Sequence, residues 1–312
     1  MARPIAILAF AAAFANASPA AALESHVLNN GPGDGTLVDF EVWPNGWFGW
    51  DYGLGDLYDP VGLLPPVSTI FRSEMHIRYS GETSGRGAFG GPVTSMTGDA
   101  TSVTSHITLA PLPFEFDITQ VLTPLLTDGA QTGSILTQTY RVQNTSSSEY
   151  SFEFVRYLDA DIRLDGLFDG GGRMVENGLE ILFQTDSANG TPYSPVFIGL
   201  TGEGGIVPAS ARFEINRSHI LNNRIYLGQP FLDFVFNDGG DADQIVDEGA
   251  GYDVMLGLRN VFVLPPGGSG TYVTRTIFAT TPEPGSLPLL ALGLAWLAGA
   301  RRRRARIANH QV

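Results

Sequence analysis

The chain has 312 residues, with 32 acidic and 18 basic side chains and a formal net charge of −14. This acidic balance argues against nucleic acid as a partner, because binding to phosphates needs a basic patch. The chain has no cysteine, which excludes both a disulfide framework and a thiol nucleophile.

Residues 1–22 have the features of a Sec-type signal peptide. Arg3 precedes an apolar run from Ile5 to Ala15, and Ala20-Ala21-Ala22 offers small residues for cleavage. We expect cleavage after Ala22, with Ala15-Asn16-Ala17 as an alternative. The sequence then divides into a signal peptide (1–22), an ectodomain (23–281) and a C-terminal segment (282–312). The ectodomain keeps 31 acidic and 12 basic residues, so its formal net charge is −19.

The tryptophans of the ectodomain lie together near its N-terminus, at Trp43, Trp47 and Trp50. Flat aromatic rings beside Asn45 are typical of a sugar-binding platform, because sugar rings stack on them while polar groups bind the hydroxyls. The alternative is that these rings fill the core, with Pro44-Asn45-Gly46 as the turn of a hairpin.

Short stretches of alternating polar and apolar residues fill most of the ectodomain. Phe114–Ile118 alternates strictly, and glycine, proline, asparagine and aspartate separate the stretches. We expect strands at Thr69–Tyr79, Val103–Leu109, Phe114–Ile118, Ser134–Gln143, Ser151–Leu158, Leu179–Gln184, Val196–Leu200, Val254–Leu258, Val261–Leu264 and Thr271–Thr280. The stretch Gly81–Gly98 indicates a long mobile loop, and we expect no amphipathic helix in the ectodomain. The pattern predicts an all-β fold, a large antiparallel β-sandwich of about a dozen or more strands.

Two acidic stretches are candidate calcium sites. The first contains Asp159, Asp161 and Asp165, whose alternation at the end of a strand points the carboxylates the same way. Calcium prefers six to eight oxygen ligands from such flexible acidic loops. The alternative is a solvated acidic turn, with Arg156 and Arg163 as ion partners.

The second acidic stretch runs from Asn237 to Glu248. Its candidate ligands are Asp238, Asp241, Asp243 and Asp247. Mutual repulsion destabilises such a cluster unless it is fully solvated or binds a cation. Calcium binding and a disordered acidic loop are the two interpretations.

Catalysis has weaker support in the sequence. Either acidic stretch offers a carboxylate pair for a glycosidase, which needs two carboxyl groups about 5–10 Å apart across a cleft. The four ectodomain histidines, His26, His76, His106 and His219, have no zinc-binding spacing. We therefore assign no catalytic residues.

The last thirty-one residues form a sorting and anchoring signal in three parts. Pro282-Glu283-Pro284 comes first, an uncharged run from Gly285 to Ala300 follows, and Arg301-Arg302-Arg303-Arg304 ends it. The run is marginal for a span, since a bilayer core needs about 20 apolar residues, and flanking arginines extend its reach. Its large apolar residues are Leu287, Leu289, Leu290, Leu292, Leu294, Trp296 and Leu297. By the positive-inside rule, the four arginines keep that end in the cytoplasm.

This C-terminal segment resembles the PEP-CTERM sorting signal of Gram-negative bacteria. The resemblance covers about a tenth of the chain, and the order of its three parts makes it specific. It implies processing near Pro282-Glu283-Pro284 by a membrane-embedded exosortase, and export in a bacterium that makes exopolysaccharide. The N-terminal signal peptide indicates that export uses the Sec machinery. The protein is then expected in the inner membrane before processing and at the cell surface or in the extracellular matrix afterwards.

We expect a non-catalytic structural or polysaccharide-associated protein with this address. A carbohydrate-active enzyme of the same fold is the main alternative. A periplasmic assembly partner is a third possibility, and it predicts an exposed apolar patch.

Overall fold

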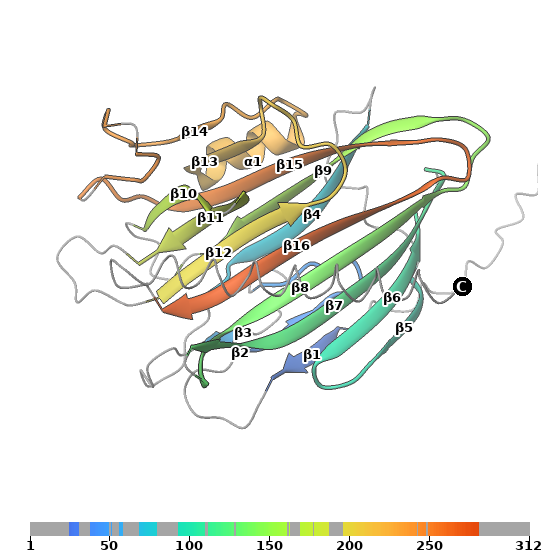
Figure 1. The fold of residues 1–312 in the computed structure, drawn as a ribbon, viewed down its shortest axis with the longest axis horizontal. Helices are drawn as coiled ribbons and strands as arrows, with labels where there is room; N and C mark the ends of the chain where they lie inside the picture. Colours follow the sequence, from blue (N-terminus) through green and yellow to red (C-terminus); the bar gives the residue numbers. More distant parts are fainter. Residues whose placement is uncertain are drawn as a thin grey trace, which may run out of the picture.

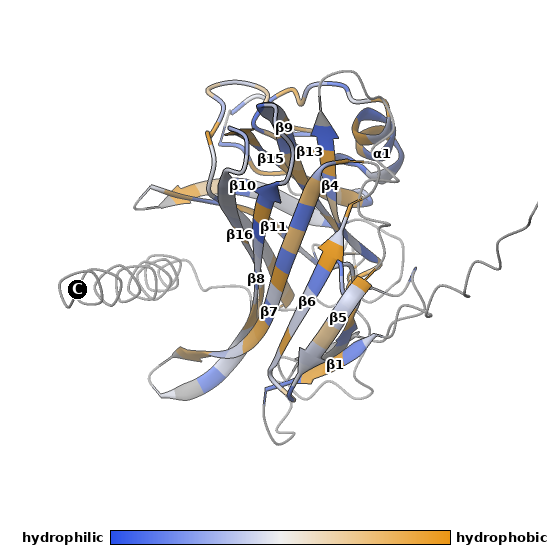
Figure 2. Cartoon of the chain, turned by 90° about the vertical axis from the view of Figure 1, so that its right-hand side faces the viewer, coloured by the Kyte–Doolittle hydropathy of each residue, from blue (hydrophilic) through white to orange (hydrophobic). Residues whose placement is uncertain are grey.

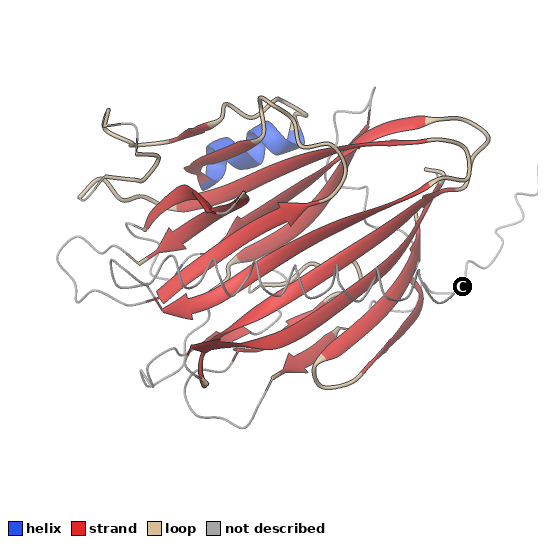
Figure 3. Cartoon of the chain, viewed as in Figure 1, coloured by secondary structure: helices blue, strands red, loops and turns tan. Residues whose placement is uncertain are grey.

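The computed structural model describes residues 25–30, 38–49, 51, 56–58, 69–79, 93–109, 112–127, 129–160, 162, 169–176, 178–186, 196–241, 243–247 and 249–280. These residues form sixteen strands and one helix (Figure 3). The predicted signal peptide and C-terminal segment lie outside them, so the division at residues 22 and 281 stays a prediction. The described helix is too short and too polar to cross a membrane.

An eight-stranded antiparallel sheet forms one layer of the molecule (Figure 1). Its strands, in spatial order, are β10 (Gly170–Glu176), β11 (Leu179–Thr185), β12 (Val196–Glu203), β16 (Ser269–Thr280), β8 (Ala130–Asn144), β7 (Phe114–Thr127), β6 (Ser102–Thr108) and β5 (Val93–Gly98). Orange and blue bands alternate along β7 in Figure 2, as expected of a strand with one face turned to the core.

Two smaller sheets complete the sandwich. The five-stranded sheet has the order β14 (Phe234–Val235), β13 (Phe213–Arg217), β15 (Val254–Leu264), β9 (Tyr150–Asp159) and β4 (Arg72–Tyr79). The three-stranded sheet consists of β1 (His26–Asn29), β2 (Val38–Val42) and β3 (Asp56–Tyr58). Every described pairing is antiparallel except the short parallel contact between β13 and β14.

Apolar side chains from both layers fill the interior. Phe154 of β9 lies at the centre of one cluster, with its ring stacked 5.1 Å from Tyr272 and edge-on to Phe262 at 5.2 Å. Aromatic pairs of this geometry add about 0.5–1.5 kcal/mol each to the free energy of burial. The alternation seen in the sequence therefore becomes a core between two sheets, and the predicted all-β antiparallel fold is confirmed.

Several details differ from the expected elements. Six strands, β1, β2, β3, β10, β13 and β14, were not expected. The expected strands Val254–Leu258 and Val261–Leu264 are one continuous strand, β15. The last third of the expected loop Gly81–Gly98 is instead a strand, β5, whose side chains bury little surface and which depends on backbone pairing with β6. The rest of the expected loop lies outside the described residues. The helix α1 (Ser218–Tyr226) was not expected, because only Leu221 and Ile225 turn inward and so short a repeat gives a weak helical pattern.

One fully buried cation joins the two layers. Arg156 of β9 is 0% exposed, and its guanidinium donates to the carbonyl oxygens of Glu74 (2.8 Å) and Tyr157 (2.5 Å). It also donates to Ser73 Oγ at 2.6 Å and reaches Gln138 Oε1 of the eight-stranded sheet at 3.5 Å. Burial lowers the pKa of Arg156, because desolvation opposes its charge. The expected role of Arg156 as an ion partner of a solvated turn is therefore wrong.

Candidate functional site

The acidic loop Asn237–Asp247 closes one side of the sandwich. It leaves the edge strand β14 of the five-stranded sheet and runs beside β10, the edge of the eight-stranded sheet, at the upper left of Figure 1. Arg173 N donates to Gln244 O at 2.9 Å, and Val246 N donates to Gly171 O at 2.8 Å. These bonds pair the exposed edge of β10 and so protect it from association with other chains. The loop is therefore a seam between the two layers.

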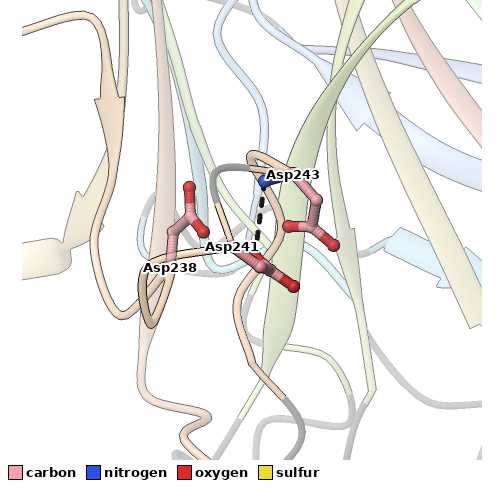
Figure 4. A group of neighbouring side chains, drawn as sticks. All are labelled: Asp238, Asp241 and Asp243. Carbon is pink, nitrogen blue, oxygen red and sulfur yellow. Dashed lines mark hydrogen bonds between the residues drawn. The ribbon is translucent and has the colours of Figure 1, made fainter.

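Three carboxylates gather within this loop. One oxygen each from Asp238, Asp241 and Asp243 lies within 4.8 Å of the others, and Figure 4 shows the three side chains along one turn of the chain. Asp243 N donates to Asp241 Oδ1 at 3.3 Å, and Gln244 N donates to Asp238 Oδ2 at 3.2 Å. The sequence prediction that these three residues come together is in agreement with this geometry, while the metal itself stays a prediction.

The electrostatics of the loop favour a cation or a proton. Desolvation raises the pKa of Asp238, and the charges of Asp241 and Asp243 raise it further. The Oδ1 atom of Asp238 is buried and has no hydrogen-bond partner among the described residues. Asp247 lies next to this group. Its carboxylate is so near Gly239 that a Cβ on that glycine would overlap it. Four carboxylates thus share one loop, where oxygen ligands suit calcium.

The other predicted calcium ligands lie elsewhere or outside the described residues. Asp159 is 3% exposed, and its Oδ2 accepts a hydrogen bond from Ser218 Oγ at 3.2 Å. It therefore does not lie in a solvated turn. Asp161 and Asp165 are outside the described residues, so a calcium site in this stretch stays a prediction.

Trp43 and Trp47 lie against the sandwich. Gln120 Nε2 donates to Trp43 O at 2.8 Å, and Gln138 Nε2 donates to Gly46 O at 2.6 Å, so this segment rests on the inner face of the eight-stranded sheet. Trp47 Nε1 donates to Met75 O at 3.2 Å, and its side chain is half-buried. Trp50 lies outside the described residues, and the three-ring sugar platform stays a prediction.

A buried polar cluster was missed by the sequence analysis. On β4, His76 Nε2 lies 2.8 Å from Glu74 Oε2, and both side chains are at most 1% exposed. The imidazole stacks on Tyr157 at 5.3 Å and meets Tyr226 of α1 edge-on at 5.9 Å. The signal was present in Arg72, Glu74, His76 and Arg78, which alternate along one face of β4. The sequence indicates that face only as part of a strand, because nothing in it shows that Tyr226 packs against His76.

Comparison with known families identifies the C-terminal segment. Residues 280–304 match the model of the PEP-CTERM protein-sorting motif. The chain carries a PEP-CTERM motif. The match begins at the last residue of β16, so the motif directly follows the sandwich. The PEP-CTERM motif marks an exported protein that is an exosortase substrate and is membrane-anchored before processing.

Three solved structures have limited similarity to this chain. One is a bacterial glucoamylase in complex with acarbose, with 12% identity and a TM-score of 0.48, which covers 87% of this chain and 37% of that one. Another is a putative kojibiose phosphorylase from the human microbiome, with 9% identity and a TM-score of 0.40, covering 80% of this chain and 30% of that one. The Slr1438 protein from Synechocystis sp. PCC 6803 has 9% identity and a TM-score of 0.40, covering 83% and 96%.

These likenesses carry no functional conclusion at such identities and TM-scores. The chain also spans only 37% and 30% of the lengths of the glucoamylase and the phosphorylase. The chain has no match among the curated proteins.

Proposed function

We propose that this exported protein is a non-catalytic component of the cell envelope or extracellular matrix that associates with extracellular polysaccharide. The observation that carries the proposal is the PEP-CTERM motif directly after the last strand of a β-sandwich. Sec export and exosortase processing would deliver the folded sandwich to the outside of the cell. Its negative charge would keep it soluble in a hydrated matrix.

The acidic loop supports a binding role better than a catalytic one. A glycosidase needs two carboxyl groups on opposite sides of a sugar, about 5–10 Å apart. Asp238, Asp241 and Asp243 instead lie along one turn of one loop, with their oxygens within 4.8 Å of one another. That geometry suits a shared cation between carboxylates.

Polysaccharide binding is the direct test of the proposed function. We expect the exported protein without its terminal segments to bind the exopolysaccharide of its own bacterium saturably, with no release of reducing sugar. The measurement is co-sedimentation over a range of polysaccharide concentrations, with a reducing-sugar assay on the same samples. Released sugar would favour the alternative, a carbohydrate-active enzyme. Absence of both binding and release would contradict the polysaccharide-associated role.

We further propose that the acidic loop binds calcium and thereby stabilises the seam. At calcium concentrations about 100-fold above Kd, binding adds about 2.7 kcal/mol to the free energy of unfolding. We expect calcium to raise the melting temperature, chelator to reverse the rise, and the double variant Asp241→Asn with Asp243→Asn to lose the response. The control is Glu149→Gln, which removes an exposed carboxylate outside the loop.

Metal-free protein gives an independent check, because without calcium the double variant is expected to be more stable than the parent. The reason is that the double variant removes repulsion between carboxylates.

Since the folded-state pKa of Asp238 is raised, metal-free stability should increase as the pH falls through that pKa toward the usual carboxyl value of 3.8. Calcium affinity should fall over the same range, because protons compete for the carboxylate. An unchanged calcium response in the double variant would contradict the site.

A further inference from the structure

The outer face of the eight-stranded sheet carries a contiguous apolar cluster, which we call the outer patch. The outer patch consists of Leu125, Ile135, Ile181, Phe183, Phe197, Ile277 and Ala279, with Met174 and Leu179 beside it. These residues come from six neighbouring strands, β10, β11, β12, β16, β8 and β7. The far end of the β7–β8 hairpin bends toward this side of the sheet in Figure 2.

The register places the outer patch opposite the core. Ile277 pairs with both Ile135 and Gly199 across the sheet, and paired residues share a face. The next residue along β16, Phe278, belongs to the core cluster between the sheets. Because successive side chains of a strand point to opposite faces, Ile277 and its partners point away from that core.

The outer patch is buried, although no described element covers it extensively. Ile181 and Ile277 are 0% exposed, and Phe197 is 1% exposed. The described helix α1 packs on β13 and β15, in the other layer, and β15 and β1 contact the eight-stranded sheet from the inside. Side chains on a sheet face turned to water would keep much of their surface exposed, so burial of this degree indicates that the outer patch packs against a partner.

The position of the end of β16 indicates which segment packs on the outer patch. Ile277 and Ala279 belong to the outer patch, and the described chain ends one residue later, at Thr280. Only residues 281–284 separate that point from the apolar run Gly285–Ala300, and four residues span at most about 14 Å. A helix of sixteen residues is about 24 Å long. Six strands about 4.8 Å apart span about 24 Å between the first and the last.

We propose that the outer patch is a docking site for the chain's own apolar run, Gly285–Ala300, whenever that run is outside the membrane. Burial of apolar surface on both partners drives the contact. The same run inserts into the bilayer in the anchored precursor, so the outer patch and the membrane compete for it. Removal of the run by processing uncovers the outer patch on the released protein.

Fluorescence quenching by Trp296 tests this docking in the full chain. The chain has no cysteine, so single engineered cysteines take a bimane label cleanly. Thr185→Cys places the label beside Phe197, and Thr123→Cys places it beside Ile135 at the opposite side of the outer patch. Asn223→Cys on the exposed side of α1 is the matched control.

Docking predicts loss of bimane fluorescence at residue 185, residue 123 or both in aqueous buffer, restored by Trp296→Phe and independent of protein concentration. The label at residue 223 should be unaffected. Vesicles of phosphatidylethanolamine and phosphatidylglycerol should also restore the fluorescence, because they take up the apolar run. Two results would overturn the proposal: fluorescence at both positions that Trp296→Phe leaves unchanged, or quenching that disappears on dilution, which would assign the occupant to a second copy.

Discussion

Replacing Arg156 with alanine is expected to lower the free energy of unfolding by about 3–5 kcal/mol. The guanidinium is fully buried and contacts Ser73, Glu74 and Tyr157 in one layer and Gln138 in the other. Truncation leaves a cavity and removes the donors that satisfy these buried oxygens. Arg156→Lys should lose most of the same stability, because one ammonium does not span both sheets as a planar fork does.

The matched control is Arg275→Ala. Arg275 forms an ion pair with Glu203, and the two side chains are 14% and 40% exposed. Partly exposed pairs of this kind contribute about 1 kcal/mol or less. Urea denaturation followed by circular dichroism measures both variants against the parent. Equal, small losses for Arg156→Ala and Arg275→Ala would show that Arg156 does not hold the layers together.

Replacing Pro282, Glu283 and Pro284 with alanine is expected to abolish release of the protein from the membrane. Exosortase would no longer recognise the motif, while the apolar run Gly285–Ala300 would still insert and the arginines would still hold its cytoplasmic end. The protein should accumulate as an unprocessed precursor in the membrane fraction. Immunoblotting of membrane, periplasmic and extracellular fractions measures the change.

The matched control replaces Pro265 and Pro266, two exposed prolines of the turn before β16, with alanine. Both variants remove two prolines, but only the first variant alters the sorting motif. The control should be processed and released like the parent. If the motif variant is also released normally, recognition does not depend on Pro282-Glu283-Pro284.

Local pattern was enough to predict the fold class and the address. Strands such as β7 and β9 alternate with period two, which is a property of neighbouring residues, and the structure confirms an antiparallel sandwich. The PEP-CTERM motif is likewise confirmed, because its parts are contiguous in the chain. Helix α1 was missed because its nine residues bury only two side chains, which is too few to give a recognisable helical repeat.

The acidic loop could be predicted from local pattern, whereas the buried polar groups could not. Asp238, Asp241 and Asp243 were predicted together because six residues of one loop contain all three. Glu74 and His76 were equally close in sequence, yet their pairing became notable only because both side chains are buried, with Tyr226 of α1 against the imidazole. Burial depends on which elements pack on a strand, and the residues of that strand alone do not indicate them.

The export signal, the all-β class and the acidic loop could be predicted from the sequence, because each is encoded by residues that are neighbours in the chain. The tertiary structure was needed to show that Arg156 lies between two sheets and that the loop joins β14 to β10. It alone also showed that an apolar cluster lies on the outer face beside the end of β16. These features depend on strand order and on the layers that meet, and contacts between residues distant in sequence set both.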